Sequence, residues 1–243
     1  MRLMGMPWVS ENDEGMDARR FILQMLHELQ EIGWFLYNTA NVKGTADCMF
    51  FIRHPNGEDG WDEKSDFSMI SLNNNDRLRL IDCDEKMPAR FRKCIDTHWG
   101  KGLIQREGQF HGAYEFKFKG EPWCADAQDV VYSRYLIVKV IEMLRKHGWE
   151  FYHAVDMTRK LNDKAVMIFR KSTPKEVIHW ALAPAEVDKL RVIGAPNSVI
   201  ETVRKFIQHY YPNGITSENP NFYSCHEFKM KGMPWYEFAA SKK

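Results

Sequence analysis

The tetrapeptide Gly-x-Pro-Trp occurs three times in the chain, at residues 5–8, 120–123 and 232–235, with spacings of 115 and 112 residues. Around the last two copies the match extends backwards, because Glu115-Phe116-Lys117 returns as Glu227-Phe228-Lys229. A recurrence of this length favours a tandem duplication of one folding unit. The repeat predicts unit 1 at residues 1–115, unit 2 at 116–225, and an extra closing strand and tail at 226–243.

Local patterns give unit 2 its expected elements. Residues 115–119 alternate polar and apolar side chains, which is typical of a strand. Residues 129–147 place apolar side chains at helical spacing, and Gly148 follows as a C-terminal cap. Four aromatic or β-branched runs predict strands, and a second helix is expected from Ser198. The four runs are residues 149–157, 165–171, 177–182 and 189–193.

Unit 1 has counterparts of these elements. A helix is expected over residues 21–32, with Gly33 in the capping position, and Pro88 opens a second helix. The expected strands are 34–42, 48–53, 67–72 and 77–81, and the first strand is reduced to Met1–Met4. The sequence therefore predicts an α+β fold with antiparallel sheets, in which a strand, helix, four strands, helix unit is duplicated.

That order of elements resembles the TATA-binding-protein fold, in which two tandem units of this kind form a curved antiparallel saddle. The resemblance lies in topology alone, since none of that family's signature residues is present. It implies a fold and no function. Other α+β sandwiches with helices on one face fit the same order of elements.

Composition and motifs restrict the class of protein. No apolar run approaches the roughly 20 residues that cross a bilayer, and no basic segment precedes an apolar stretch at the N-terminus, so we expect an intracellular protein, cytoplasmic or nuclear, without a membrane partner. The five cysteines form no Cys-x-x-Cys pair and lie away from histidine at zinc-ligand spacing, which predicts reduced thiols and no metal. Fingerprints of dinucleotide sites, phosphate loops and hydrolase elbows are missing, which predicts no cofactor and favours a protein that is not an enzyme.

The two halves of the chain carry opposite charge. Residues 1–115 hold 14 basic and 19 acidic side chains, whereas residues 116–243 hold 20 and 14. Such asymmetry is consistent with an acidic partner for the second half, with attraction between the halves, or with drift of solvated surface charge.

Residues that recur in both units have a structural and a functional interpretation. Trp8, Trp123 and Trp235 either anchor a tight turn or line a ligand groove at the strand ends. Arg19 and Arg134 match in the first helix, and Arg53 and Arg170 match at a strand end. These arginines either form structural ion pairs or clamp a phosphate or carboxylate.

Basic side chains are expected to share the polar side of the sheets, while their apolar neighbours point inward. This predicted basic face consists of Arg77, Arg79, Lys117, Lys119, Lys189, Arg191, Lys229 and Lys231. It suits a nucleic-acid backbone, although lysines on edge strands also prevent sheet-to-sheet aggregation.

These observations favour a non-enzymatic tandem-repeat module that binds a protein partner as an adaptor. Two alternatives stay open. One is a nucleic-acid-binding saddle that uses the basic sheet face, and the other is an enzyme whose site lies between the two units.

Overall fold

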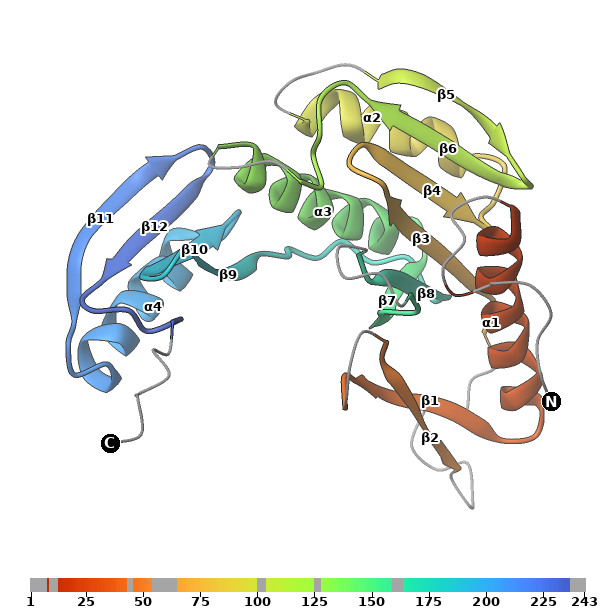
Figure 1. Ribbon diagram of the computed structural model, residues 1–243, viewed down its shortest axis with the longest axis horizontal. Coiled ribbons are helices and arrows are strands. Elements are labelled where there is room, and N and C mark those ends of the chain that lie inside the picture. Colours follow the sequence, from red (N-terminus) through yellow and green to blue (C-terminus); the bar gives the residue numbers. More distant parts are fainter. Residues whose placement is uncertain are drawn as a thin grey trace, which may run out of the picture.

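The computed structural model describes residues 8, 13–42, 46–53, 65–99, 104–124, 128–158 and 164–236. Within these ranges the chain forms four helices and twelve strands (Figure 1). None of these helices combines the length and the apolar character that crossing a membrane requires. The expected strand at Met1–Met4 lies outside the described residues.

In the described part of the chain, each helix is followed by a run of strands, four after α1 and α3 and two after α2 and α4. The helices are α1 (Asp13–Glu31), α2 (Met87–His98), α3 (Gln128–Lys146) and α4 (Asn197–Tyr210). The first six strands are β1 (Trp34–Ala40), β2 (Cys48–Arg53), β3 (Phe67–Asn73), β4 (Arg77–Ile81), β5 (Ile104–Phe110) and β6 (Ala113–Phe118). The others are β7 (Trp149–Val155), β8 (Val166–Lys171), β9 (Ala181–Ala185), β10 (Lys189–Ile193), β11 (Ile215–Phe222) and β12 (Cys225–Met230).

The strands form three antiparallel sheets, so the expected α+β class is confirmed. The largest has six strands in the order β5-β6-β4-β3-β8-β7, and a second has the order β11-β12-β10-β9. The third is the β1-β2 hairpin alone. The six-stranded sheet combines strands of both predicted units, because β8 pairs with β3, and the predicted boundary after residue 115 falls within β6.

Helices cover both faces of the six-stranded sheet, because its strands alternate between two cores. Ile70 and Leu80 point into the core formed with α2 and α3. Their neighbours Met69 and Ile81 point into the other core, which α1 and the β1-β2 hairpin complete. The saddle is not confirmed, since the described strands form three sheets and helices pack on both faces of the six-stranded one.

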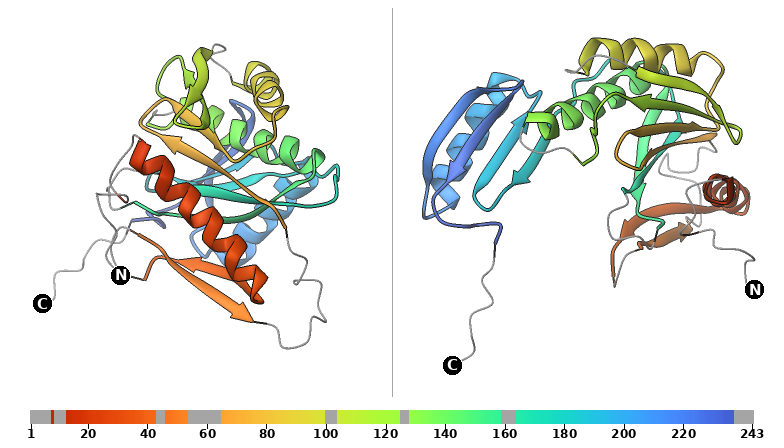
Figure 2. Two further views of the ribbon diagram at one scale, coloured as in Figure 1. Left: turned by 90° about the vertical axis from the view of Figure 1, so that its right-hand side faces the viewer. Right: turned by 45° about the horizontal axis from the view of Figure 1, so that its top comes forward.

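Helix α3 connects the two larger sheets. Its residues Leu136 and Val140 are buried in the core of the six-stranded sheet, and Val131, nearer its start, packs with Ile193 of the four-stranded sheet. The four-stranded sheet with α4 therefore lies at one end of the molecule, and α1 with β1 and β2 at the other (Figures 1 and 2). Gly148 ends α3 at φ 80°, where a Cβ would lie 2.8 Å from the carbonyl oxygen of Ser172.

Two strands were not predicted from the sequence. Both β5 and β11 are outer strands of hairpins, their residues are mostly polar and none of them is buried, so neither carries an alternating apolar pattern. Pro220 within β11 further weakened its strand signal. In addition, the strand expected at 177–182 begins only at Ala181.

Candidate functional site

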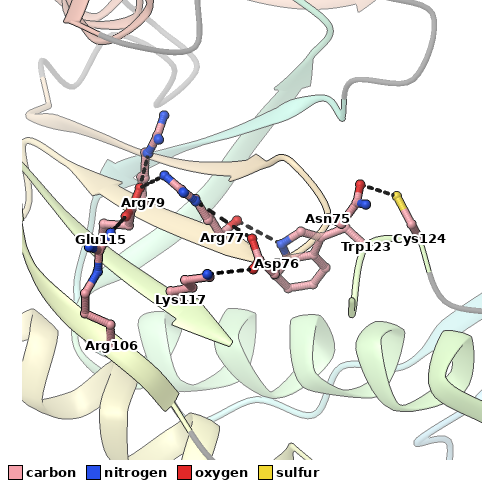
Figure 3. A network of polar contacts seen from close by, with 9 residues as sticks. All are labelled: Asn75, Asp76, Arg77, Arg79, Arg106, Glu115, Lys117, Trp123 and Cys124. Carbon is pink, nitrogen blue, oxygen red and sulfur yellow. Dashed lines mark hydrogen bonds and ion pairs between the residues drawn. The ribbon is translucent and has the colours of Figure 1, made fainter. Parts of the chain in front are cut away.

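A buried ion pair joins strands β4 and β6 of the six-stranded sheet. Arg79 of β4 lies opposite Glu115 of β6, with 2.8 Å between Nε and Oε2, and the two side chains are 1% and 5% exposed. Arg77 and Arg106 approach the same carboxylate at 3.4 and 3.5 Å (Figure 3). Three guanidinium groups therefore surround one carboxylate, an arrangement that satisfies its lone pairs at low dielectric.

The Gly-x-Pro-Trp turn fastens the neighbouring β3-β4 turn. Trp123 donates its indole N–H to the carbonyl oxygen of Arg77 at 2.8 Å and its backbone N–H to the carbonyl oxygen of Asn75 at 3.0 Å. Asp76 in that turn lies 3.7 Å from Nζ of Lys117 (Figure 3). The indole is buried against Phe118, as the structural interpretation of this tryptophan requires.

The same contacts occur 112 residues later in the four-stranded sheet. Arg191 of β10 pairs with Glu227 of β12 at 2.7 Å, and the indole N–H of Trp235 donates to the carbonyl oxygen of Lys189 at 2.8 Å. The guanidinium of Arg191 also reaches Glu186 at 3.2 Å. Each buried arginine lies over a phenylalanine of the outer strand, Arg79 over Phe110 and Arg191 over Phe222.

The structure corrects the prediction of an open basic face at two of its residues. Arg79 and Arg191 are buried, because helices α1 and α3 pack on that side of the two sheets. Four further residues of that face have carboxylate partners, at 3.8 Å or less: Arg77, Lys117, Lys189 and Lys229. Lys119 and Lys231 are exposed. Acidic side chains, which the prediction of a basic face did not take into account, therefore neutralise most of that face.

Two buried polar side chains of β3 distinguish the six-stranded sheet. Ser71 and Asn73 lie directly opposite Arg79 and Arg77, both are fully buried, and neither the hydroxyl nor the amide has a hydrogen-bond partner. The four-stranded sheet has small apolar residues in the matching part of β9. No sequence signal marked these two residues, since isolated Ser and Asn in a strand are usually surface residues.

The arginines that match between the predicted units do not converge on one site. Arg19 is buried in α1 and donates to the carbonyl oxygen of Gly15 at 2.8 Å, whereas Arg53 is exposed at the end of β2. Arg170 pairs with Glu150 at 3.0 Å. Burial, and then the nearby charge of Arg191, lower the pKa of Arg134, whose buried Nη1 has no hydrogen-bond partner.

Two hollows flank α2. The larger, about 1040 Å³, lies between α2 and α3, and its lining includes Cys94, His98 and His147. Burial raises the pKa of the Cys94 thiol to about 12 and lowers the pKa of both histidines. A thiol with so high a pKa is a poor nucleophile, so this groove contains no activated cysteine. The smaller hollow, about 570 Å³, lies between α2 and β5 and has an acidic lining.

Trp8 and Trp235 differ from Trp123 in exposure. Trp8 packs, partly buried, against the core beneath α1, whereas Trp235 is 41% exposed. In the part of the chain that the structure describes, no three His, Cys, Asp or Glu side chains are grouped so as to hold a metal ion.

Comparison with known proteins adds a family and no function. Residues 1–52, 66–170 and 179–242 match the model of one domain family, whose description names no activity. The chain belongs to that family. The central matched segment begins just before β3 and ends within β8, so it spans the strands of the six-stranded sheet with α2 and α3. Neither a curated protein nor a solved structure matches the chain.

Proposed function

We propose that the chain is a tandem-repeat interaction module that binds protein partners through its two ends. One repeat in this proposal is β3 to β8 with α2 and α3, the span of the central family match. The N-terminal part, α1-β1-β2, corresponds to the last third of that unit, and the C-terminal part, β9-β10-α4-β11-β12, corresponds to its beginning. The recurring Arg–Glu and Trp contacts, 112 residues apart, support this assignment.

The observation that carries the proposal is the uncovered apolar face of the C-terminal part. Phe206 of α4 is 61% exposed, and Cys94, at the matching position of α2, is buried beneath α3. Leu182 of β9 is 50% exposed, and Ile70, at the matching position of β3, is buried. Large exposed apolar side chains that adjoin an unpaired edge strand are typical of protein-binding surfaces.

Charge pairing favours protein over nucleic acid as the partner. A phosphate-binding face needs cations that are free to contact the backbone, and four of the eight residues in the predicted basic face have carboxylate partners while two more are buried in ion pairs.

The experiment is capture of protein by the immobilised chain from nuclease-treated extract, compared between the wild type, Phe206→Asp and Val42→Asp. Val42 is exposed outside the C-terminal face, so its variant is the matched control. We expect saturable capture that Phe206→Asp reduces, because only the N-terminal end remains intact in it, and that Val42→Asp leaves unchanged.

Two results would overturn the proposal. One is equal capture by Phe206→Asp and the wild type. The other is nucleic-acid binding that weakens steeply between about 50 and about 200 mM salt and is lost in Lys119→Glu with Lys231→Glu, since it would transfer the function to the basic face.

A further inference from the structure

We infer that the chain associates with itself head to tail, so that α1-β1-β2 of one copy docks on β9 and α4 of the next. This inference rests on the proposed function, because it identifies the partner of the two open ends as a second copy. The template lies within the chain itself, where α3, β7 and β8 pack on β3 and α2 and bury a common core.

The N-terminal end has an exposed version of the face that α3, β7 and β8 bury. Three buried side chains of that internal interface have more exposed counterparts at matching positions of α1, β1 and β2: Leu136 and Phe21, Trp149 and Trp34, Met167 and Met49. Phe21 is 49% and Trp34 is 38% exposed. The opposite face of α1 packs on the six-stranded sheet, as the start of α3 packs on the four-stranded sheet. The exposed face therefore lacks the layer that covers its counterpart.

The C-terminal end has the complementary face. Three residues of β3 and α2 that contact the α3 layer are buried, and their counterparts in β9 and α4 are more exposed: Ile70 and Leu182, Phe91 and Val203, Cys94 and Phe206. Tyr210, at the end of α4, extends this face and is also exposed. A helix placed on α4 as α3 is placed on α2 covers these side chains, and α1 has the apolar pattern for that position.

The sheet edges provide a register for the same contact. Among the strands that the structure describes, β9 is the outer strand of its sheet, and β2 pairs with β1 alone. Within the chain, β3 and β8 pair so that Ile70 lies opposite Met167. The matching pair between two copies is Leu182 opposite Met49, which joins two sheets by antiparallel strand addition.

Charge complementarity favours this orientation. Glu28 and Glu31 are exposed on α1 at positions that match Met143 and Lys146 of α3, which line the groove facing α2. On α4 the corresponding groove residues include Lys205 and His209. An acidic helix therefore meets a basic one, in agreement with the 14 basic and 19 acidic residues of the first half and the 20 and 14 of the second.

The contact uses different surfaces on its two sides, so it is heterologous, and every open assembly keeps one free N-terminal face and one free C-terminal face. Addition of further copies extends the same array of sheets and helices that the single chain contains. We therefore expect the assembly to grow with concentration and not to stop at a dimer.

The first test measures the mass of the full chain by sedimentation and light scattering from about 1 to about 200 μM. The mass of the wild type should rise above 28.6 kDa as concentration increases. Phe21→Asp and Phe206→Asp should each remain monomeric, and Val42→Asp should behave as the wild type. Near-ultraviolet circular dichroism verifies that the variants are folded, and Met49→Asp with Leu182→Asp provides a second pair.

An equimolar mixture of Phe21→Asp and Phe206→Asp is the decisive sample. Each variant retains one intact end, so the mixture should form a dimer of twice 28.6 kDa and no larger species. In the Cys48→Ser background, Met49→Cys should form a disulfide with Leu182→Cys on another copy, whereas Val42→Cys should not.

The outcomes separate the inference from the proposed function. A wild type that is monomeric throughout the range, or variants that do not complement each other, overturns head-to-tail association. If Phe206-dependent capture of another protein persists in that case, the interaction module stands and its partner is a different protein. If that capture fails as well, both proposals fall.

Discussion

The six-stranded and four-stranded sheets contain the same Arg–Glu pair and the same indole-to-carbonyl hydrogen bond, yet they differ in what covers them. The six-stranded sheet includes the β7-β8 hairpin and has α2 and α3 on one face, and Phe91 and Cys94 are buried there. The four-stranded sheet has α4 alone on that side, and Phe206 is exposed. Four strands and one helix therefore suffice for the shared framework, which is β3 to β6 with α2 in one sheet and β9 to β12 with α4 in the other. In the six-stranded sheet the next elements along the chain, α3 and the β7-β8 hairpin, complete the core.

The largest expected difference between the sheets is at the tryptophans. Trp123→Ala should lower the free energy of unfolding by about 3–5 kcal/mol, the usual range for emptying a buried aromatic site. Trp235→Ala should cost about 1 kcal/mol, since that side chain is 41% exposed and loses chiefly its hydrogen bond. Urea unfolding measures both, with Trp123→Phe as the control that keeps a ring. Equal losses for the two alanine variants would contradict the difference in coverage.

A second comparison concerns the buried carboxylates. Glu115→Ala should destabilise the chain by about 3–5 kcal/mol, because it leaves the buried guanidinium of Arg79 without its carboxylate. Glu227→Ala should cost about 2 kcal/mol, because Arg191 retains Glu186 at 3.2 Å. Thermal and urea unfolding test the order. The double variant Arg79→Met with Glu115→Leu is the control, and it should recover much of the loss if unpaired charge is the cause.

The smallest change in the free energy of unfolding is expected for a substitution at Phe206 of α4, whose matching residue in α2 is Cys94. Phe206→Cys should alter the free energy of unfolding by less than about 1 kcal/mol, since Phe206 is exposed. Its new thiol should react with iodoacetamide at pH 8 roughly a thousandfold faster than Cys94, because burial raises the pKa of Cys94 to about 12 and leaves little thiolate. Mass spectrometry of digested samples gives both rates, and similar rates would contradict a covered α2 and an open α4.

Three native cysteine thiols, two of them outside the comparison of α2 with α4, predict a loss of stability at high pH. Burial raises the pKa of Cys83, Cys94 and Cys225 from 9.0 to about 11, 12 and 11. The folded state therefore holds protons that the unfolded state releases above about pH 9, so stability should fall as pH rises from 9 towards 11. Unfolding curves at pH 7.5, 9 and 10.5 measure this, and Cys94→Ala should reduce the slope.

Much of the fold followed from local patterns. The alternation at 115–119 and the helical spacing at 129–147 predicted β6 and α3 closely, because periodicity reports which side chains are buried. Strands β5 and β11 escaped prediction, since outer hairpin strands bury little and show no period. The basic face illustrates a different limit, because alternation placed Arg79 on the polar side but could not reveal that a helix covers that side.

The sequence by itself determined the α+β class, the recurring turn and the positions of most helices and strands, since these depend on neighbours a few residues apart. The tertiary structure alone decided which strands share a sheet, that β8 completes the sheet of β3, and that Arg79 and Arg191 are buried against Glu115 and Glu227. It alone also distinguished the covered α2 from the open α4. Contacts between residues far apart in the chain set burial, and burial determines whether the same residue stabilises a core or faces a partner.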